Sequence, residues 1–116
     1  PGAFSTDGEL PDVPSNVTLH VGLFRETLPR YGALGLPPPR LVHVDSDLYS
    51  SARDVLATLA PILEPGTVLV FDEYLANDDW QNDEFRAFQE IREERGFRYE
   101  YLAFNWFTGQ AVVRIG

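Results

Sequence analysis

The sequence contains no cysteine, so neither a disulfide framework nor a thiolate metal site can form. The absence of cysteine is typical of reducing compartments, and we expect a cytoplasmic protein. Lysine is also absent, and the nine basic residues are outnumbered by 18 acidic ones, giving a net charge of −9. This charge disfavours nucleic-acid binding, which needs a basic surface against the phosphates. No run of about 18 apolar residues occurs, so no membrane-spanning helix is expected.

Methionine is absent as well, and the chain begins at Pro1. Because translation starts with methionine, we expect these 116 residues to be a piece of a longer protein. Apolar residues make up 44% of the chain and aromatic residues 13%, which predicts a folded domain rather than a disordered segment. The length allows one small domain with a modest core.

Hydrophobic patterning predicts an α/β fold. Residues 1–16 are rich in proline and glycine and are expected to form a loop, followed by one domain over residues 17–116. Strands are predicted over residues 17–21, 40–44, 67–71, 98–104 and 110–115. Helices are predicted over residues 24–31, with an interruption at Pro29, between Ser51 and Pro65, and between Asp83 and Gly96. This order indicates a mainly parallel sheet that ends in an antiparallel hairpin.

Acidic residues follow two of the predicted strands. Asp45 and Asp47 come directly after one apolar run, and Asp72 and Glu73 come directly after the next. Ligands of open α/β sheets bind where parallel strands end, so these carboxylates are expected to meet in one crevice. A group of carboxylates is costly unless a cation, a proton or water compensates the charge. The pattern therefore indicates a metal site or a general-base site.

Three segments together resemble one enzyme family, the macrocin O-methyltransferases. They are Gly22-Leu23-Phe24-Arg25-Glu26-Thr27-Leu28-Pro29, His43-Val44-Asp45-Ser46-Asp47-Leu48-Tyr49-Ser50-Ser51, and Pro65-Gly66-Thr67 with Phe71-Asp72-Glu73-Tyr74. The family consists of class I S-adenosylmethionine-dependent enzymes, many of which methylate sugars of natural products. The resemblance implies a three-layer Rossmann-like fold, of which this chain would supply the C-terminal half with the last five strands. No Gly-x-Gly motif occurs, so the glycine-rich cofactor turn of the family has no counterpart in this sequence.

The resemblance also implies roles for particular residues. It implies that Asp45, Asp72 and Glu73 hold Mg²⁺, and that Asp45 also acts as a base on a hydroxyl acceptor and contacts the cofactor. Further contacts to S-adenosylmethionine fall on Gly22 and Phe24. Aromatic residues that flank the crevice, Tyr49, Tyr74 and Trp80, are expected to shape the acceptor pocket.

Other interpretations stay open at this point. Asp47 is expected to cap the following turn or helix, and His43 to be a packed histidine within its strand rather than a base. Asp45-Ser46-Asp47 also matches the Asp-x-Asp pattern of nucleotide-sugar glycosyltransferases that bind manganese. The chain could instead be a non-catalytic half-domain that associates through an exposed sheet edge. In either case we expect a homo-oligomer.

Overall fold

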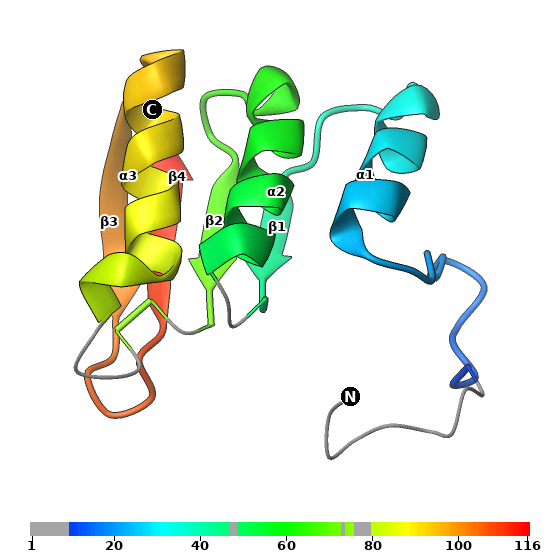
Figure 1. Ribbon diagram of the computed structural model, residues 1–116, viewed down its shortest axis with the longest axis horizontal. Coiled ribbons are helices and arrows are strands. Elements are labelled where there is room, and N and C mark those ends of the chain that lie inside the picture. Colours follow the sequence, from blue (N-terminus) through cyan, green and yellow to red (C-terminus); the bar gives the residue numbers. More distant parts are fainter. Residues whose placement is uncertain (1–9, 47–48, 73, 76–79) are drawn as a thin grey trace.

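The computed structural model describes residues 10–46, 49–72, 74–75 and 80–116 (Figure 1). The helices are α1 (Phe24–Ala33), α2 (Tyr49–Leu59) and α3 (Glu84–Arg95), with short 3₁₀ segments η1 (Ala60–Ile62) and η2 (Trp80–Asn82). The strands are β1 (Leu41–Val44), β2 (Val68–Phe71), β3 (Tyr99–Phe104) and β4 (Ala111–Ile115). Among the described helices, none has the length and apolar composition needed to cross a membrane.

The sheet is mixed rather than mainly parallel. Its strand order is β1-β2-β4-β3. Only β1 and β2 run parallel, with Val44 opposite Phe71 at the end of the pair. β4 pairs antiparallel with both β2 and β3, and β3 carries a bulge between Tyr101 and Ala103. The predicted terminal hairpin is confirmed. The predicted predominance of parallel pairing is wrong, because β4 inserts between β2 and β3.

The predicted strand over residues 17–21 is wrong. These residues are exposed and have no place in the four-stranded sheet, although their apolar side chains alternate as expected. A strand needs a neighbour to satisfy its backbone groups, and within the described residues no strand lies beside this segment. The described part of the predicted N-terminal loop, residues 10–16, has neither helix nor strand, and residues 1–9 lie outside the described residues.

The helices lie over one face of the sheet. α2 and α3 pack side by side in front of the strands, and α1 packs against α2 beyond β1 (Figure 1). The opposite face is uncovered in the described part of the chain, where Leu41 of β1 is 64% exposed. The described residues therefore form two layers instead of the predicted three. An α/β architecture is confirmed, with a second helix layer missing.

The core lies between α2, α3 and the central strands. Its largest fully buried side chains include Leu56 of α2, Phe88 and Ile91 of α3, and Leu69 and Phe71 of β2. Burying each such side chain stabilises the fold by roughly 1.5–3 kcal/mol. Because β2 lies between β1 and β4, both of its ladders are paired and one face is sealed by helices.

The helix boundaries follow local chemistry. α2 ends at Leu59 and continues as the 3₁₀ turn η1, which contains Pro61, because proline removes a helical hydrogen bond. α3 ends at Gly96, which adopts φ 71° and accepts the left-handed conformation without a Cβ penalty. Pro29 does not interrupt α1, which runs through to Ala33, contrary to the prediction from the sequence.

Candidate functional site

Two of the predicted acidic residues directly follow the ends of paired parallel strands. Asp45 directly follows Val44 of β1, and Asp72 directly follows Phe71 of β2, its partner in the parallel pair. The backbone N–H of Asp72 donates to the carbonyl oxygen of Val44 at 3.0 Å. Asp45 and Asp72 therefore follow neighbouring strand ends at one edge of the sheet. Asp47 and Glu73 lie outside the described residues.

Asp72 is held by side chains from the two strands on either side of β2. The Nε2 atom of His43, on β1, lies 3.6 Å from its Oδ1 atom. The amide of Gln110, just before β4, donates to the same oxygen at 3.1 Å. The His43 side chain is 54% exposed, so the packed histidine expected from the sequence is instead a surface residue. Gln110 is 38 residues from Asp72 in sequence, and no local pattern indicates their contact.

The donor chemistry of this edge suits a hard cation only in part. Mg²⁺ binds oxygen ligands and commonly uses one or two carboxylates together with several waters. Asp45 and Asp72 are of this type and lie on neighbouring strands. No group of three or more acidic or histidine ligands occurs among the residues that the structure describes. The described residues therefore supply two carboxylates toward such a site, and Glu73, the third ligand implied by the resemblance, lies outside them.

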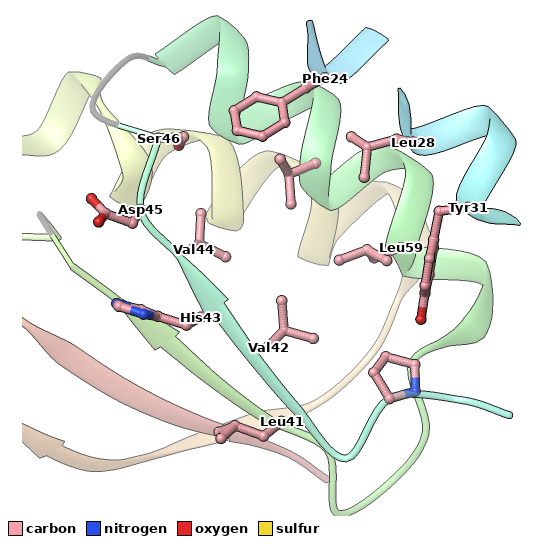
Figure 2. Close-up of a pocket in the computed structure, with 12 residues that line it drawn as sticks. Phe24, Leu28, Tyr31, Leu41, Val42, His43, Val44, Asp45, Ser46 and Leu59 are labelled. Carbon is pink, nitrogen blue, oxygen red and sulfur yellow. The ribbon is translucent and has the colours of Figure 1, made fainter. Parts of the chain in front are cut away.

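A cavity of about 420 Å³ opens along the free edge of β1 (Figure 2). Phe24 and Leu28 of α1 face Val42 and Val44 of β1 across it, and Asp45 lines it where the strand ends. A second cavity of about 440 Å³ is lined by Gly22, Phe24 and the start of α2. The structure thus places all three predicted cofactor residues on two cavities that share Phe24. The wall of the first cavity is mainly apolar, and Asp45 adds an acidic group at its rim. This arrangement suits a ligand with both kinds of surface.

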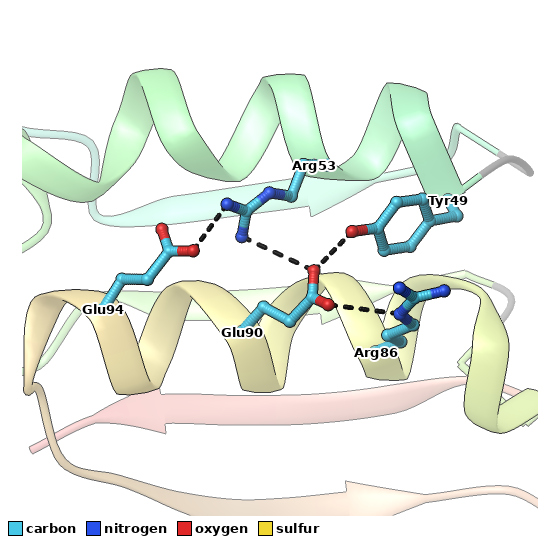
Figure 3. Close-up of polar contacts among 5 residues, drawn as sticks. All are labelled: Tyr49, Arg53, Arg86, Glu90 and Glu94. Atoms are coloured by element: carbon cyan, nitrogen blue, oxygen red, sulfur yellow. Dashed lines mark hydrogen bonds and ion pairs between the residues drawn. The ribbon is translucent and has the colours of Figure 1, made fainter.

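Tyr49 lies away from these cavities, in the interface between α2 and α3 (Figure 3). Its hydroxyl donates to Glu90, and the Arg86 guanidinium lies 4.6 Å from the centre of its ring. Arg53 joins the same network through Glu94 at 2.6 Å and Glu90 at 3.6 Å. The hydrogen bond to Glu90 raises the pKa of Tyr49, and the same bond lowers the pKa of Glu90. The structure gives Tyr49 a clear role in holding the two helices together.

Tyr74 and Trp80, which were predicted to shape the acceptor pocket, come together near the end of β2. Both line a separate cavity of about 160 Å³ with Phe85 of α3 and residues of the β3–β4 hairpin. The Tyr74 side chain is buried, and its hydroxyl lies 2.7 Å from that of Tyr101. Burial, followed by the contact with Tyr101, raises the pKa of Tyr74 far above its usual value. Sequence reasoning did not identify Tyr101, because it belongs to a strand 27 residues away.

The chain matches a known protein family over more than half of its length. A methyltransferase domain family matches residues 2–74, a stretch that contains both acidic strand ends. The chain belongs to this methyltransferase domain family. Family membership implies S-adenosylmethionine as the methyl donor, and it confirms the resemblance drawn from the three sequence segments.

Characterised methyltransferases resemble parts of this chain. An 8-demethyl-8-(2,3-dimethoxy-alpha-L-rhamnosyl)-tetracenomycin-C 4′-O-methyltransferase of Streptomyces olivaceus is 42% identical over 55 residues, which are 46% of this chain and 19% of that enzyme. Two solved structures of CalS11, a TDP-rhamnose 3′-O-methyltransferase of calicheamicin biosynthesis, are each 30% identical to the chain. They superpose with TM-scores of 0.60 and 0.61 over 80% of it.

This methyltransferase chain is shorter than these relatives. It spans 38% and 35% of the two CalS11 structures, and 19% of the Streptomyces olivaceus enzyme. The likeness accounts for the mixed sheet, because the four strands match part of a methyltransferase. The family match also favours the methyltransferase interpretation of Asp45-Ser46-Asp47 over a glycosyltransferase motif.

Proposed function

We propose that this chain forms the C-terminal part of an S-adenosylmethionine-dependent O-methyltransferase that acts on a hydroxyl of a sugar or sugar-bearing natural product. The observation that carries the proposal is the placement of Asp45 and Asp72 after the ends of paired parallel strands, with Asp45 lining a cavity that Phe24 also lines. Family membership supports methyl transfer. The sugar acceptor is supported by the relatives, whose names describe methylation of rhamnose groups.

The reaction moves a methyl group from a sulfonium to a hydroxyl oxygen, and the hydroxyl proton must leave. Asp45 is placed at the rim of the Phe24 cavity, where its carboxylate can accept that proton. His43 and Gln110 orient the Asp72 carboxylate, because both contact its Oδ1 atom. These contacts position the acidic edge before any ligand arrives, which reduces the cost of reorganisation.

Mg²⁺ is the proposed metal, held by Asp45 and Asp72 with Glu73 as a third ligand. A bound divalent cation would lower the pKa of an acceptor hydroxyl and orient it. The proposed cofactor contacts are Gly22 and Phe24, which line the cavity at the start of α1, together with Asp45. An aromatic side chain such as Phe24 offers a flat apolar surface to an adenine ring.

The test is methyl transfer from S-adenosylmethionine to a panel of rhamnosides in the presence of Mg²⁺, followed by mass spectrometry. The neutral variants Asp45→Asn and Asp72→Asn are expected to lower the rate by about 10²–10⁴-fold, because each removes a group acting on the hydroxyl. Glu93→Gln is the matched control, since it neutralises an exposed acid on α3 away from the edge. Equal rates for Asp72→Asn and Glu93→Gln would remove Asp72 from the mechanism.

Magnesium binding is measured separately by calorimetry. We expect Asp72→Asn to weaken Mg²⁺ binding by roughly tenfold or more, and Glu93→Gln to leave it unchanged. Equal binding by all three proteins would contradict the proposed metal ligands while leaving the acid–base role of Asp45 to the rate measurement.

A further inference from the structure

The cavity that contains Tyr74 and Trp80 is lined almost wholly by aromatic rings. Its volume is about 160 Å³, and apart from Leu75 and Ala111 every lining residue is aromatic. The lining residues are Tyr74, Leu75, Trp80, Phe85, Tyr101, Phe104, Trp106 and Ala111. Three of the hairpin rings are largely exposed: Tyr101 at 46%, Phe104 at 58% and Trp106 at 65%. Adjacent exposed aromatic rings around one cavity are typical of a binding surface.

Three separate parts of the chain build this cavity, and a backbone hydrogen bond joins two of them. The N–H of Leu75, after β2, donates to the carbonyl oxygen of Gly109 in the hairpin at 2.8 Å. Within the turn, the N–H of Gly109 donates to the carbonyl oxygen of Asn105 at 2.8 Å. The side-chain oxygen of Asn105 also accepts from the N–H of Phe107 at 2.8 Å. The rings are therefore carried by an anchored turn, which lowers the entropy cost of binding a rigid ligand.

The rings pack edge to face, and a further ring can add to this packing. Trp80 and Phe85 meet edge to face with centres 5.0 Å apart, and Tyr74 and Phe85 do so at 5.4 Å. Phe104 and Trp106 form a third such pair at 5.7 Å. The hydroxyls of Tyr74 and Tyr101 are already hydrogen-bonded to each other. The cavity therefore offers aromatic contact rather than hydrogen-bonding groups, and its volume suits a flat ring system of one or two rings.

The aromatic cavity lies at the same end of the sheet as the acidic residues Asp45 and Asp72. Tyr74 lies two residues after Asp72, and Ala111 on the cavity wall directly follows Gln110, whose amide donates to Asp72 at 3.1 Å. The β3–β4 turn lies at the same end of the sheet as the ends of β1 and β2 (Figure 1). A ligand with a ring in this cavity and a sugar attached to it would therefore lie at the same end of the sheet as Asp72.

We propose that this cavity binds an aromatic ring of the group that carries the sugar, so that the acceptor is an aryl glycoside. The inference rests on the proposed sugar O-methyltransferase function and narrows its substrate class. The rhamnosyl acceptor in the name of the Streptomyces olivaceus relative is likewise attached to a larger group, tetracenomycin C. Binding the ring contributes affinity remote from the hydroxyl, and that affinity positions the hydroxyl at the acidic edge.

The chain has two tryptophans, Trp80 and Trp106, and both line this cavity, so their signals can report whether it is occupied. Their indole N–H signals in a nitrogen-15 NMR spectrum report occupancy directly. We expect 4-nitrophenyl α-L-rhamnoside to shift both signals in a saturable manner. Methyl α-L-rhamnoside, which has the same sugar without the ring, is expected to shift neither.

Two phenylalanines of the same hairpin provide matched variants. Phe104 lines the cavity, whereas Phe107 is fully exposed and does not. Phe104→Ala is expected to raise the Kd of the aryl rhamnoside by about 3- to 10-fold, the equivalent of one lost aromatic contact. Phe107→Ala is expected to bind like the unmodified chain. Both variants keep both tryptophans, and the dispersion of their spectra shows whether each is folded.

The proposal is overturned if the two rhamnosides shift the indole signals equally, if no saturable shift occurs up to the solubility limit, or if Phe104→Ala and Phe107→Ala bind alike. It is also overturned if the indole signals move on dilution of the protein alone, because the rings would then be a self-association surface. Failure of the proposed function has a different signature. In that case Asp72→Asn would leave Mg²⁺ binding and methyl transfer unchanged, whatever the aryl rhamnoside does.

Discussion

The centre of the sheet and its β1 edge differ in how completely they are packed. Around β2 and β4, Leu69, Phe71 and Val113 are fully buried beneath α2 and α3. At the β1 edge, no strand of the described residues lies beyond β1, Leu41 is 64% exposed, and α1 buries only Thr27 among its residues. β2, β4 and α3 therefore contribute to a well-packed core. β1 and α1 keep apolar surfaces that no described residue covers.

The largest test of this contrast compares two phenylalanines. Phe88 of α3 is fully buried, whereas Phe24 of α1 is 40% exposed at the cavity beside β1. Phe88→Ala is expected to lower the free energy of unfolding by about 3–5 kcal/mol, because it leaves a cavity in the core. Phe24→Ala is expected to lower it by about 1 kcal/mol or less. Urea unfolding followed by circular dichroism measures the free energy of unfolding of both variants. Equal losses would show that the core and the β1 edge are equally packed.

The next test compares the two edges of the sheet. We predict that the chain forms a homo-oligomer through β1, whose outer edge has no partner strand among the described residues, rather than through β3, whose edge is broken by the bulge near Leu102. Leu41→Lys is expected to weaken association by roughly 10- to 100-fold, the equivalent of exposing one buried leucine. Sedimentation velocity measures the association.

Leu102→Lys is the matched control for the edge comparison, because Leu102 is 47% exposed on β3. It is expected to leave association unchanged. A chain that sediments as a monomer at all concentrations, or one that Leu102→Lys dissociates as strongly as Leu41→Lys, would contradict self-association through β1.

The smallest expected effect is the loss of stability at alkaline pH. It compares Tyr74, which follows β2, with Tyr49, the first residue of α2. Burial raises the pKa of Tyr74 above its ordinary value of 10.0. Below pH 10 the residue is protonated in the folded and unfolded chains, so its contribution to stability is fully present. Above pH 10 only the unfolded chain loses this proton, and stability falls by up to about 1.4 kcal/mol per pH unit.

Tyr74→Phe removes the ionisable group, so we expect unfolding of this variant to depend less on pH between pH 9 and pH 11 than that of the unmodified chain. Tyr49→Phe is the control, since the pKa of Tyr49 is also raised but through a hydrogen bond to Glu90 at the helix surface. Urea unfolding across the pH series measures the slopes. The same slope for Tyr74→Phe and the unmodified chain would show that Tyr74 ionises as readily folded as unfolded.

Local sequence was sufficient for most elements and for part of the site. The apolar run before Asp72 became β2, the stripe of Phe85, Phe88 and Ile91 became the inner side of α3, and Gly96 ended that helix. Asp45 and Asp72 lie at one edge, because β1 and β2 pair in parallel. Residues 17–21 failed as a strand prediction for the opposite reason. Their pattern is correct, but a strand exists only when a second strand satisfies its hydrogen bonds.

The contacts that complete the site depend on residues far apart in the chain. Gln110 reaches Asp72 across 38 residues, and Tyr101 reaches Tyr74 across 27. No local pattern predicts either contact, since each depends on β4 inserting between β2 and β3. Tyr49 shows the same limit, because its position next to an acidic segment suggested the acceptor site, whereas helix packing directs its hydroxyl to Glu90.

By itself, the amino-acid sequence determined the methyltransferase resemblance, the α/β order of elements and the two acidic strand ends, because each depends on residues close together in the chain. Only the tertiary structure decided the mixed sheet, the uncovered edge of β1 and the aromatic cavity beside Asp72. These features depend on which strands become neighbours, and strand pairing is settled by burial and backbone hydrogen bonding across the whole fold.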